Sequence, residues 1–202
     1  MSYDFHYDSK RRFASYWHQI REVLKRSPES VLEIGVGSGF VSNYLRSHGV
    51  TLTTIDIESD LGADTVGDAR DLPFEDQSFD IVTAYEVLEH MPFADALIAL
   101  REMRRVAKGY VIISVPDATR AARIQFPVPG IMHVRKLITI PRLFPPVHMR
   151  TKSGHEWEIG KKGYRLSFVR HEIEKQGLII EKTYRVFENP YHRFFVLRPR
   201  GH

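Results

Sequence analysis

Three glycines at alternate positions follow a short apolar run near the start of the chain. The run is Val31 to Ile34, and Gly35, Gly37 and Gly39 come directly after it. Only glycine lets a backbone turn this sharply and lie flat against a ligand. The free amides at the start of the helix that follows attract an anion such as an amino-acid carboxylate, and Glu33 can offset a cationic group. The pattern therefore indicates a site for a ligand that carries both charges.

A carboxylate stands where the next run of β-branched residues ends. Asp56 follows Gly39 by seventeen residues, and a carboxylate at a strand end can accept hydrogen bonds from both hydroxyls of a ribose. A second carboxylate, Asp68, suits the amino group of an adenine. Because ligands of open parallel sheets bind at the carboxyl ends of the strands, we expect Gly35, Asp56 and Asp68 to converge. A nicotinamide dinucleotide is a weaker alternative, because its fingerprint needs a glycine where this chain has Phe40.

Apolar periodicity predicts the elements that position these residues. Apolar side chains at three- and four-residue steps predict helices, and short β-branched runs predict strands. The expected helices span 13–24, 94–107 and 166–176, and the expected strands span 30–34, 51–55, 81–84, 110–115, 178–186 and 193–197. This alternation implies a parallel sheet covered by helices on both faces. The turn 188–191 is too short for a crossover, so the sheet should end in an antiparallel hairpin.

Residues 118–165 interrupt the alternation as an insertion. Between Asp117 and Glu156 there is no acidic residue. The basic residues there are Arg120, Arg123, Arg135, Lys136, Arg142, Arg150 and Lys152, and apolar residues such as Phe126, Ile131, Met132, Leu137, Ile138, Ile140, Leu143 and Phe144 are interleaved with them. A basic, apolar segment beside the site predicts a lid over an anionic or amphiphilic acceptor. A membrane-surface patch, a packed cap and a dimer contact are the alternatives.

These motifs, together with the stretch Tyr85 to Pro92, resemble the class I S-adenosylmethionine-dependent methyltransferases, in the broad subgroup that includes ubiquinone and menaquinone biosynthesis methyltransferases. The resemblance covers roughly residues 30–117. It implies an α/β, Rossmann-like fold with a seven-stranded, mostly parallel sheet whose last strand is antiparallel. It also implies S-adenosylmethionine as the cofactor and S-adenosylhomocysteine as the product.

The resemblance implies a role for each motif. The acidic residue and alternate glycines cradle the methionine part of the cofactor, and Tyr85 and Glu86 form the floor beneath the methionine and the sulfonium. The cofactor-binding residues that it implies are Glu33, Gly35, Gly37, Gly39, Asp56, Ile57, Asp68, Ala69, Tyr85 and Glu86. Asp56 holds the ribose, Ile57 packs on the adenine, and Asp68 with Ala69 reads the adenine edge. One departure is that only eleven residues separate Asp56 from Asp68, where the family usually fits a fuller helix.

Methyl transfer from a sulfonium is a direct displacement, so the enzyme mainly aligns the reactants and excludes water. A hydroxyl or ammonium acceptor must also lose a proton. His90 is the first candidate base, although a helix-cap histidine is its structural alternative, and His155 and His133 are further candidates. The segment His155 to Glu158 ends in a carboxylate, and Glu158 and Trp157 can line the acceptor pocket.

We predict no metal site. His155 and Glu156 lack the second histidine of a zinc-protease helix, because position 159 is Ile159, and no carboxylates have the spacing of a magnesium catechol site. Asn189-Pro190-Tyr191 is interpreted as a turn.

Composition bounds the class of protein. The 202 residues carry a net charge of +4 and no cysteine, which excludes disulfides and thiolate metal sites. No apolar run approaches the roughly 18 residues of a membrane span, and the N-terminus lacks the apolar core of a signal peptide. We therefore expect one soluble, cytoplasmic domain over residues 1–202.

We predict that this domain transfers a methyl group to a small-molecule or lipid-like acceptor, either anionic or amphiphilic. The alternatives are an RNA or protein methyltransferase, and a non-catalytic protein that binds S-adenosylmethionine or S-adenosylhomocysteine. Nucleic acid is not expected as a partner, because the aromatic and basic residues 191–195 fall in an ordinary edge strand. Peripheral membrane contact stays open.

Overall fold

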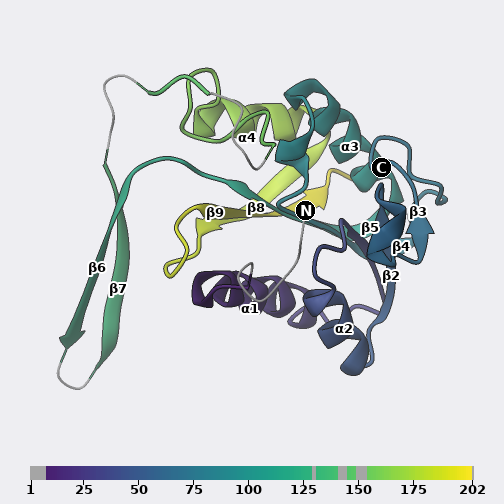
Figure 1. The fold of residues 1–202 in the computed structure, drawn as a ribbon, viewed down its shortest axis with the longest axis horizontal. Coiled ribbons are helices and arrows are strands. Elements are labelled where there is room, and N and C mark those ends of the chain that lie inside the picture. The colour runs from purple at the N-terminus through teal and green to yellow at the C-terminus, as the bar shows by residue number, and fades with distance from the viewer. Residues whose placement is uncertain (1–7, 129–130, 141–144, 149–153, 202) are drawn as a thin grey trace.

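The computed structural model describes residues 8–128, 131–140, 145–148 and 154–201. Its main sheet has seven strands in the order β3-β2-β1-β4-β5-β9-β8 (Figure 1). These strands are β1 Ser30–Ile34, β2 Thr51–Asp56, β3 Thr65–Val66, β4 Phe79–Tyr85, β5 Ala107–Pro116, β8 Leu178–Arg185 and β9 His192–Pro199. The helices are α1 Lys10–Leu24, α2 Phe40–Ser47, α3 Phe93–Val106 and α4 Leu166–Lys175.

The sheet is mostly parallel and ends in an antiparallel hairpin. The pairs β1–β2, β1–β4, β2–β3 and β4–β5 are parallel, whereas β9 runs antiparallel to both β5 and β8. A short connection cannot carry the chain across the sheet, so β9 returns directly beside β8. The predicted sheet with its reversed last strand is confirmed.

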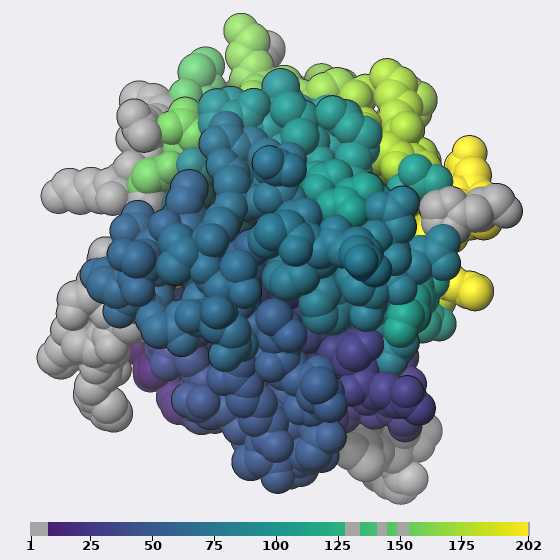
Figure 2. Space-filling view, turned by 90° about the vertical axis from the view of Figure 1, so that its right-hand side faces the viewer, coloured from purple at the N-terminus to yellow at the C-terminus, as the bar shows by residue number. Residues whose placement is uncertain are grey.

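Helices cover both faces of the sheet (Figure 1). On one face α1 and α2 contribute Tyr16, Val23 and Leu45 to a buried apolar cluster. On the other face α3 contributes Met103 and α4 contributes Ile173 to a larger cluster. Figure 2 shows the side on which the first half of the chain, in blue and teal, forms most of the surface. The two clusters fix the strands from both sides, so the strand ends are held rigidly.

Two short 3₁₀ turns connect strand ends to the rest of the fold. The first, η1 (Ser59–Leu61), occupies the space between β2 and β3, in agreement with the short connection seen in the sequence. The second, η2 (Leu88–His90), joins β4 to α3. Both lie just beyond the carboxyl ends of parallel strands, where ligands of such sheets bind.

The insertion forms a separate two-stranded antiparallel sheet, β6 (Ala121–Val128) and β7 (Ile131–Thr139). This hairpin projects away from the main sheet (Figure 1). Polar and apolar residues alternate at Arg123, Ile124, Gln125 and Phe126, which is the period of a strand. This alternation explains why these residues lack a regular helical pattern. Whether the hairpin acts as a lid stays a prediction.

None of the helices in the described ranges is both long and apolar enough to span a bilayer.

Candidate active site

A cleft of about 470 Å³ lies beyond the carboxyl ends of β1, β2 and β4. The residues that line it are Gly35, Gly37, Asp56, Ile57, Glu58, Leu61, Asp68, Arg70, Tyr85, Glu86, Val87, His90, Met91, Pro92 and Asp95. The structure thus brings Gly35, Asp56 and Asp68 together, as the parallel-sheet geometry predicts. The cleft is large enough for a small-molecule ligand.

The glycine turn forms one wall of this cleft. Gly35, Gly37 and Gly39 have φ angles of 82°, 56° and 72°, a region that favours glycine. A Cβ atom on Gly35 would also collide with Cγ2 of Val87. Gly39 is the N-cap of α2, so the turn leads straight into the amino end of a helix. This backbone can approach an anionic ligand closely.

Asp56 is held in place at the end of β2. Its Oδ2 accepts a hydrogen bond from the Val36 amide at 2.8 Å, and its Oδ1 accepts one from the Glu58 amide at 3.0 Å. Each carboxylate oxygen keeps a second lone pair, which a ribose hydroxyl can use. The neighbouring Ile57 is 66% exposed and lines the cleft. It therefore offers an apolar surface for a flat ring.

Asp68 is already paired in the structure, which the sequence did not predict. Arg70 donates from Nη2 to Asp68 Oδ2 at 2.5 Å and from Nη1 to Asp95 Oδ2 at 2.7 Å. These hydrogen bonds from Arg70 hold the pKa of Asp68 below its usual range. Asp68 therefore faces the cleft as an oriented carboxylate whose charge Arg70 partly balances. Ala69 is buried and is not among the residues that line the cleft.

Glu33 lies behind the glycine turn and is not among the residues that line the cleft. Its side chain is 3% exposed and accepts a hydrogen bond from Ser42 Oγ of α2 at 2.5 Å. Burial raises the pKa of Glu33 to about 7, although the Ser42 hydrogen bond and Arg46 oppose this shift. The observed contact fastens the turn to α2.

Two of the candidate bases, His90 and His155, lie together with Glu158 beside the cleft. The imidazole rings of His90 and His155 have centroids 5.0 Å apart, and His155 Nδ1 lies 3.2 Å from Glu158 Oε1. Tyr191 donates its hydroxyl to the same Glu158 oxygen at 2.8 Å. Partial burial and the nearby His155 lower the pKa of His90. The structure thus joins two parts of the chain that are 65 residues apart, as counted from the sequence.

Glu89, which no sequence pattern indicates as a site residue, completes this cluster. Glu89 is fully buried, and neither carboxylate oxygen accepts a hydrogen bond from any described residue. Burial raises the pKa of Glu89 well above its usual range, and the neighbouring Glu86 raises it further. Glu86 itself has a φ of 56°, and its Oε2 lies 3.6 Å from His192 Nε2. The only signal for Glu89 in the sequence is that it comes directly before His90.

Trp157 is a core residue, which differs from the expectation that it lines the acceptor pocket. It is 3% exposed, packs edge-on against Phe93 and donates from Nε1 to the Leu88 carbonyl at 3.1 Å. Its indole therefore holds η2 in position. Tyr85 lines the cleft, but its hydroxyl is buried with no partner among the described residues. For His133, the side chain lies outside the described part of the structure.

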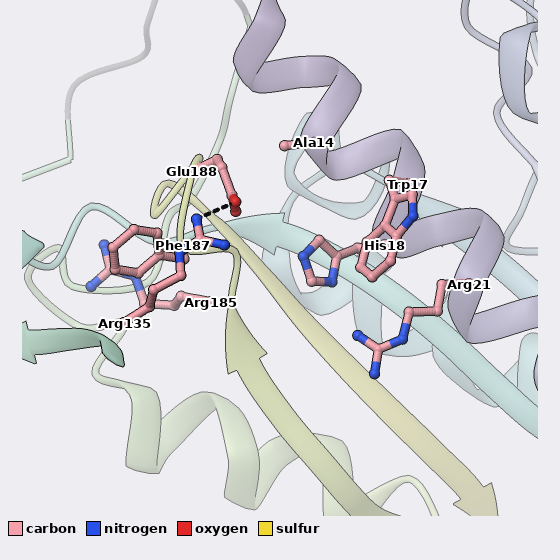
Figure 3. Close-up of a pocket in the computed structure, with 8 residues that line it drawn as sticks. All are labelled: Ala14, Trp17, His18, Arg21, Arg135, Arg185, Phe187 and Glu188. Carbon is pink, nitrogen blue, oxygen red and sulfur yellow. Dashed lines mark hydrogen bonds and ion pairs between the residues drawn. The ribbon is translucent and has the colours of Figure 1, made fainter. Parts of the chain in front are cut away.

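A second pocket, of about 520 Å³, lies where the hairpin meets α1 and the β8–β9 turn (Figure 3). Its lining residues are Ala14, Trp17, His18, Arg21, Arg135, Arg185, Phe187 and Glu188. Two of its cations already have partners within the pocket, because Arg135 pairs with Glu188 and Arg21 stacks over the Trp17 ring. No predicted site residue lies in this pocket, and we assign it to the contact of β7 with α1 and the β8–β9 turn.

Comparison with known proteins agrees with this geometry. Residues 32–113 match the family model described as a methyltransferase domain. This part of the chain is therefore similar to methyltransferase domains. The predicted family is confirmed, and the matched residues run from β1 through most of β5 and include the cofactor motifs on β1, β2 and β4.

Curated relatives of the methyltransferase domain act on small molecules, by their names. Demethylmenaquinone methyltransferase of Thermotoga maritima is 32% identical over 121 residues, which cover 50% of this chain and 52% of the relative. The probable chloroplastic tocopherol O-methyltransferase of Oryza sativa is 35% identical over 105 residues, covering 44% of this chain and 28% of the relative. The chain thus spans at most about half the length of these relatives.

Solved structures share the fold of the domain over almost the whole chain. Magnesium protoporphyrin IX methyltransferase from Synechocystis, with bound S-adenosylhomocysteine, superposes with a TM-score of 0.63 at 15% identity. The match covers 93% of this chain and 83% of the other. The 1,6-didemethyltoxoflavin-N1-methyltransferase of Burkholderia thailandensis gives a TM-score of 0.62 at 15% identity, covering 98% and 82%. At this identity the likeness concerns the fold.

Proposed function

We propose that the protein binds S-adenosylmethionine in the cleft and transfers its methyl group to a small-molecule or lipid-like acceptor. The observation that carries this proposal is the glycine turn, which has left-handed glycines at three alternate positions and is hydrogen-bonded to Asp56 at the edge of one cleft. The methyltransferase-domain match over the same residues supports the choice of cofactor.

The residues of the cleft fit the parts of this cofactor. The amino end of α2 and the turn amides suit the methionine carboxylate. Asp56 suits the ribose hydroxyls, and Ile57 offers its exposed side chain to one face of the adenine. Glu86, at the end of β4, suits the cationic side of the methionine and sulfonium. The cofactor supplies the electrophilic methyl group, and the chain aligns the acceptor with it.

The cluster of His90, His155 and Glu158 suits the acceptor side of the reaction. An acceptor hydroxyl or amine loses its proton on methylation, and an imidazole held by a carboxylate can take that proton. Glu158 orients His155 through Nδ1, which leaves Nε2 free to act. The small-molecule relatives favour this class of acceptor over RNA or protein. The basic, apolar hairpin suits an anionic or amphiphilic acceptor that it partly covers.

The experiment that tests the activity is methyl transfer from radiolabelled S-adenosylmethionine to a panel of phenolic, quinol, carboxylate and amine acceptors. The wild-type protein is expected to produce S-adenosylhomocysteine and a labelled small molecule with at least one class. His155→Asn is expected to lower turnover by about 100-fold while retaining cofactor binding. Cofactor binding without transfer to any class would favour the non-catalytic alternative, and labelled RNA or protein would favour the macromolecular one.

A further inference from the structure

The cluster beside the cleft has the donor set of a transition-metal site. Glu89 and His90 are adjacent in η2, and His155 comes from the far end of the insertion. One potential ligand atom from each of these three side chains lies within 4.8 Å of the other two. The backbone joins them as well, because the Glu156 amide donates to the Glu89 carbonyl at 2.7 Å. Two imidazoles and one carboxylate are ligands that zinc and other first-row divalent ions prefer.

The carboxylates of the cluster lack the donors that a buried carboxylate needs. Both oxygens of Glu89 and Oε1 of Glu86 are buried without a hydrogen-bond donor among the described residues. Within the described ranges, Glu89 lies near His155, whose Nε2 is 4.0 Å from Glu89 Oε1. Burying an ionised carboxylate without a partner is strongly unfavourable. A cation between these oxygens and the imidazoles would satisfy them together.

The residues around His155 already orient it as a ligand. Its Nδ1 lies 3.2 Å from Glu158 Oε1, and Tyr191 donates to that same oxygen at 2.8 Å. This arrangement makes Nδ1 the donor to Glu158 and leaves the Nε2 lone pair facing Glu89. Metal-bound histidines are commonly held in this way, by a carboxylate on the other ring nitrogen. The outer contacts of such a site are therefore present before any ion binds.

The sequence alone predicts no metal site, but from this geometry we propose that Glu89, His90 and His155 bind a divalent transition-metal ion, with Glu86 on its cleft side. In a tetrahedral site with ligand distances of about 2.0–2.2 Å, ligand atoms lie roughly 3.3 Å apart. The cluster therefore has to contract slightly, which rotation of the exposed His90 side chain can provide. Because His90 and Glu86 both line the cleft, the ion would lie next to the acceptor.

This position gives the ion a role that rests on the proposed function. With the ion bound, His155 Nε2 is a ligand and no longer a base, and the ion takes over the activation of the acceptor hydroxyl. A divalent ion that holds an acceptor oxygen lowers the pKa of the hydroxyl, so the proton leaves more easily before methyl transfer. The inference therefore favours an oxygen-bearing acceptor. Metal binding itself can be measured without the acceptor and without the cofactor.

The test is metal binding by untagged protein that has been stripped with a chelator. Zn²⁺ is added by equilibrium dialysis and counted by elemental analysis, and Co²⁺ is followed by its visible absorption. One Zn²⁺ per chain and an intense Co²⁺ band typical of tetrahedral coordination are expected. Wild-type protein that is folded, binds S-adenosylhomocysteine and takes up no stoichiometric Zn²⁺ would overturn the metal site but leave the proposed function intact.

Matched variants locate the ion. Glu89→Gln and His155→Asn are each expected to weaken Zn²⁺ binding by more than about 100-fold, and Glu158→Gln by about 10- to 100-fold. His171→Asn, an exposed histidine on α4, is the control and should bind as the wild type does. His90→Asn is a further ligand variant, and since His90 is exposed the variant should fold. Unchanged Zn²⁺ affinity in the folded ligand variants would contradict the assignment.

Discussion

At the residue scale, the role of a carboxylate in this protein depends on where its side chain points. Asp56 and Glu33 belong to the same family motifs, yet Asp56 lines the cleft and Glu33 is buried behind the glycine turn. Asp68 faces the cleft but is paired with Arg70. Substitutions of Asp56 and Glu33 are therefore expected to have different effects.

Asp56→Ala is expected to weaken S-adenosylhomocysteine binding by about 100-fold, because it removes the acceptor of two ribose hydrogen bonds, each worth roughly 1–2 kcal/mol. The matched control is Asp60→Ala, since Asp60 is exposed in the neighbouring turn η1. Calorimetric titration of both folded variants gives the comparison. Equal affinity in the two variants would remove Asp56 from the site.

Glu33→Gln is expected to change how stability depends on pH. The folded-state pKa of about 7 lies above the ordinary value of 4.5, so the native state binds a proton more tightly than the unfolded chain. This contribution is fully present below the unfolded pKa and is lost as pH rises through about 7, by about 3 kcal/mol. Glutamine does not titrate. Urea unfolding at about pH 5 and about pH 8 should therefore show the wild type losing stability relative to the variant, whereas parallel curves would contradict it.

At the element scale, Glu22 connects α1 to β8, the last strand in the order of the main sheet. This carboxylate is fully buried and receives hydrogen bonds from Lys182 at 3.0 Å and Tyr184 at 3.1 Å, both on β8. Burial alone would raise the pKa of Glu22, but hydrogen bonds from Lys25, Lys182 and Arg26 outweigh it and lower the pKa to about 2.

Glu22→Gln should therefore destabilise the protein at neutral pH, by about 2 kcal/mol. Because the folded pKa lies below the ordinary 4.5, the stabilisation is present above that value and is lost as pH falls toward 2. Thermal unfolding of the wild type and the variant should consequently converge in acid. Glu29→Gln, at an exposed position just before β1, is the control and should match the wild type throughout.

The β6–β7 hairpin is a second element, for which the effects on cofactor affinity and on turnover can be separated. Arg135, midway along β7, pairs with Glu188 and stacks over Phe187. Replacing Arg135 and Lys136 by alanine should leave cofactor affinity unchanged and lower turnover on the acceptor, because neither residue lines the cleft. Arg200→Ala is the control for loss of a surface cation. Turnover equal to that of the control would contradict a role of the hairpin over the acceptor.

At the scale of the whole molecule, the sheet could be predicted because its strands leave a local signal. Every predicted strand lies within three residues of an observed one, since β-branched runs bounded by glycine, proline and polar residues mark strands directly. The cofactor cleft followed from the same argument, because parallel strand ends meet at one edge. Glycines and Asp56 carried that prediction.

The parts of the site that the sequence does not predict depend on contacts between distant segments. Glu89 and His155 are 66 residues apart in the sequence, so no local spacing reveals the buried cluster that they form. The pairing of Arg70 with both Asp68 and Asp95 likewise needs α3 to be in place. Trp157 looked like a pocket residue because aromatic side chains suit both pockets and cores, and only packing against Phe93 distinguishes them.

Calorimetric titration of the purified protein with S-adenosylmethionine, S-adenosylhomocysteine and NADH in parallel is the decisive measurement. We expect one site with micromolar affinity for the first two ligands and no binding of NADH, because Phe40 occupies the position of the dinucleotide glycine. A folded protein that binds neither sulfur compound, or that binds NADH in their place, would contradict this expectation.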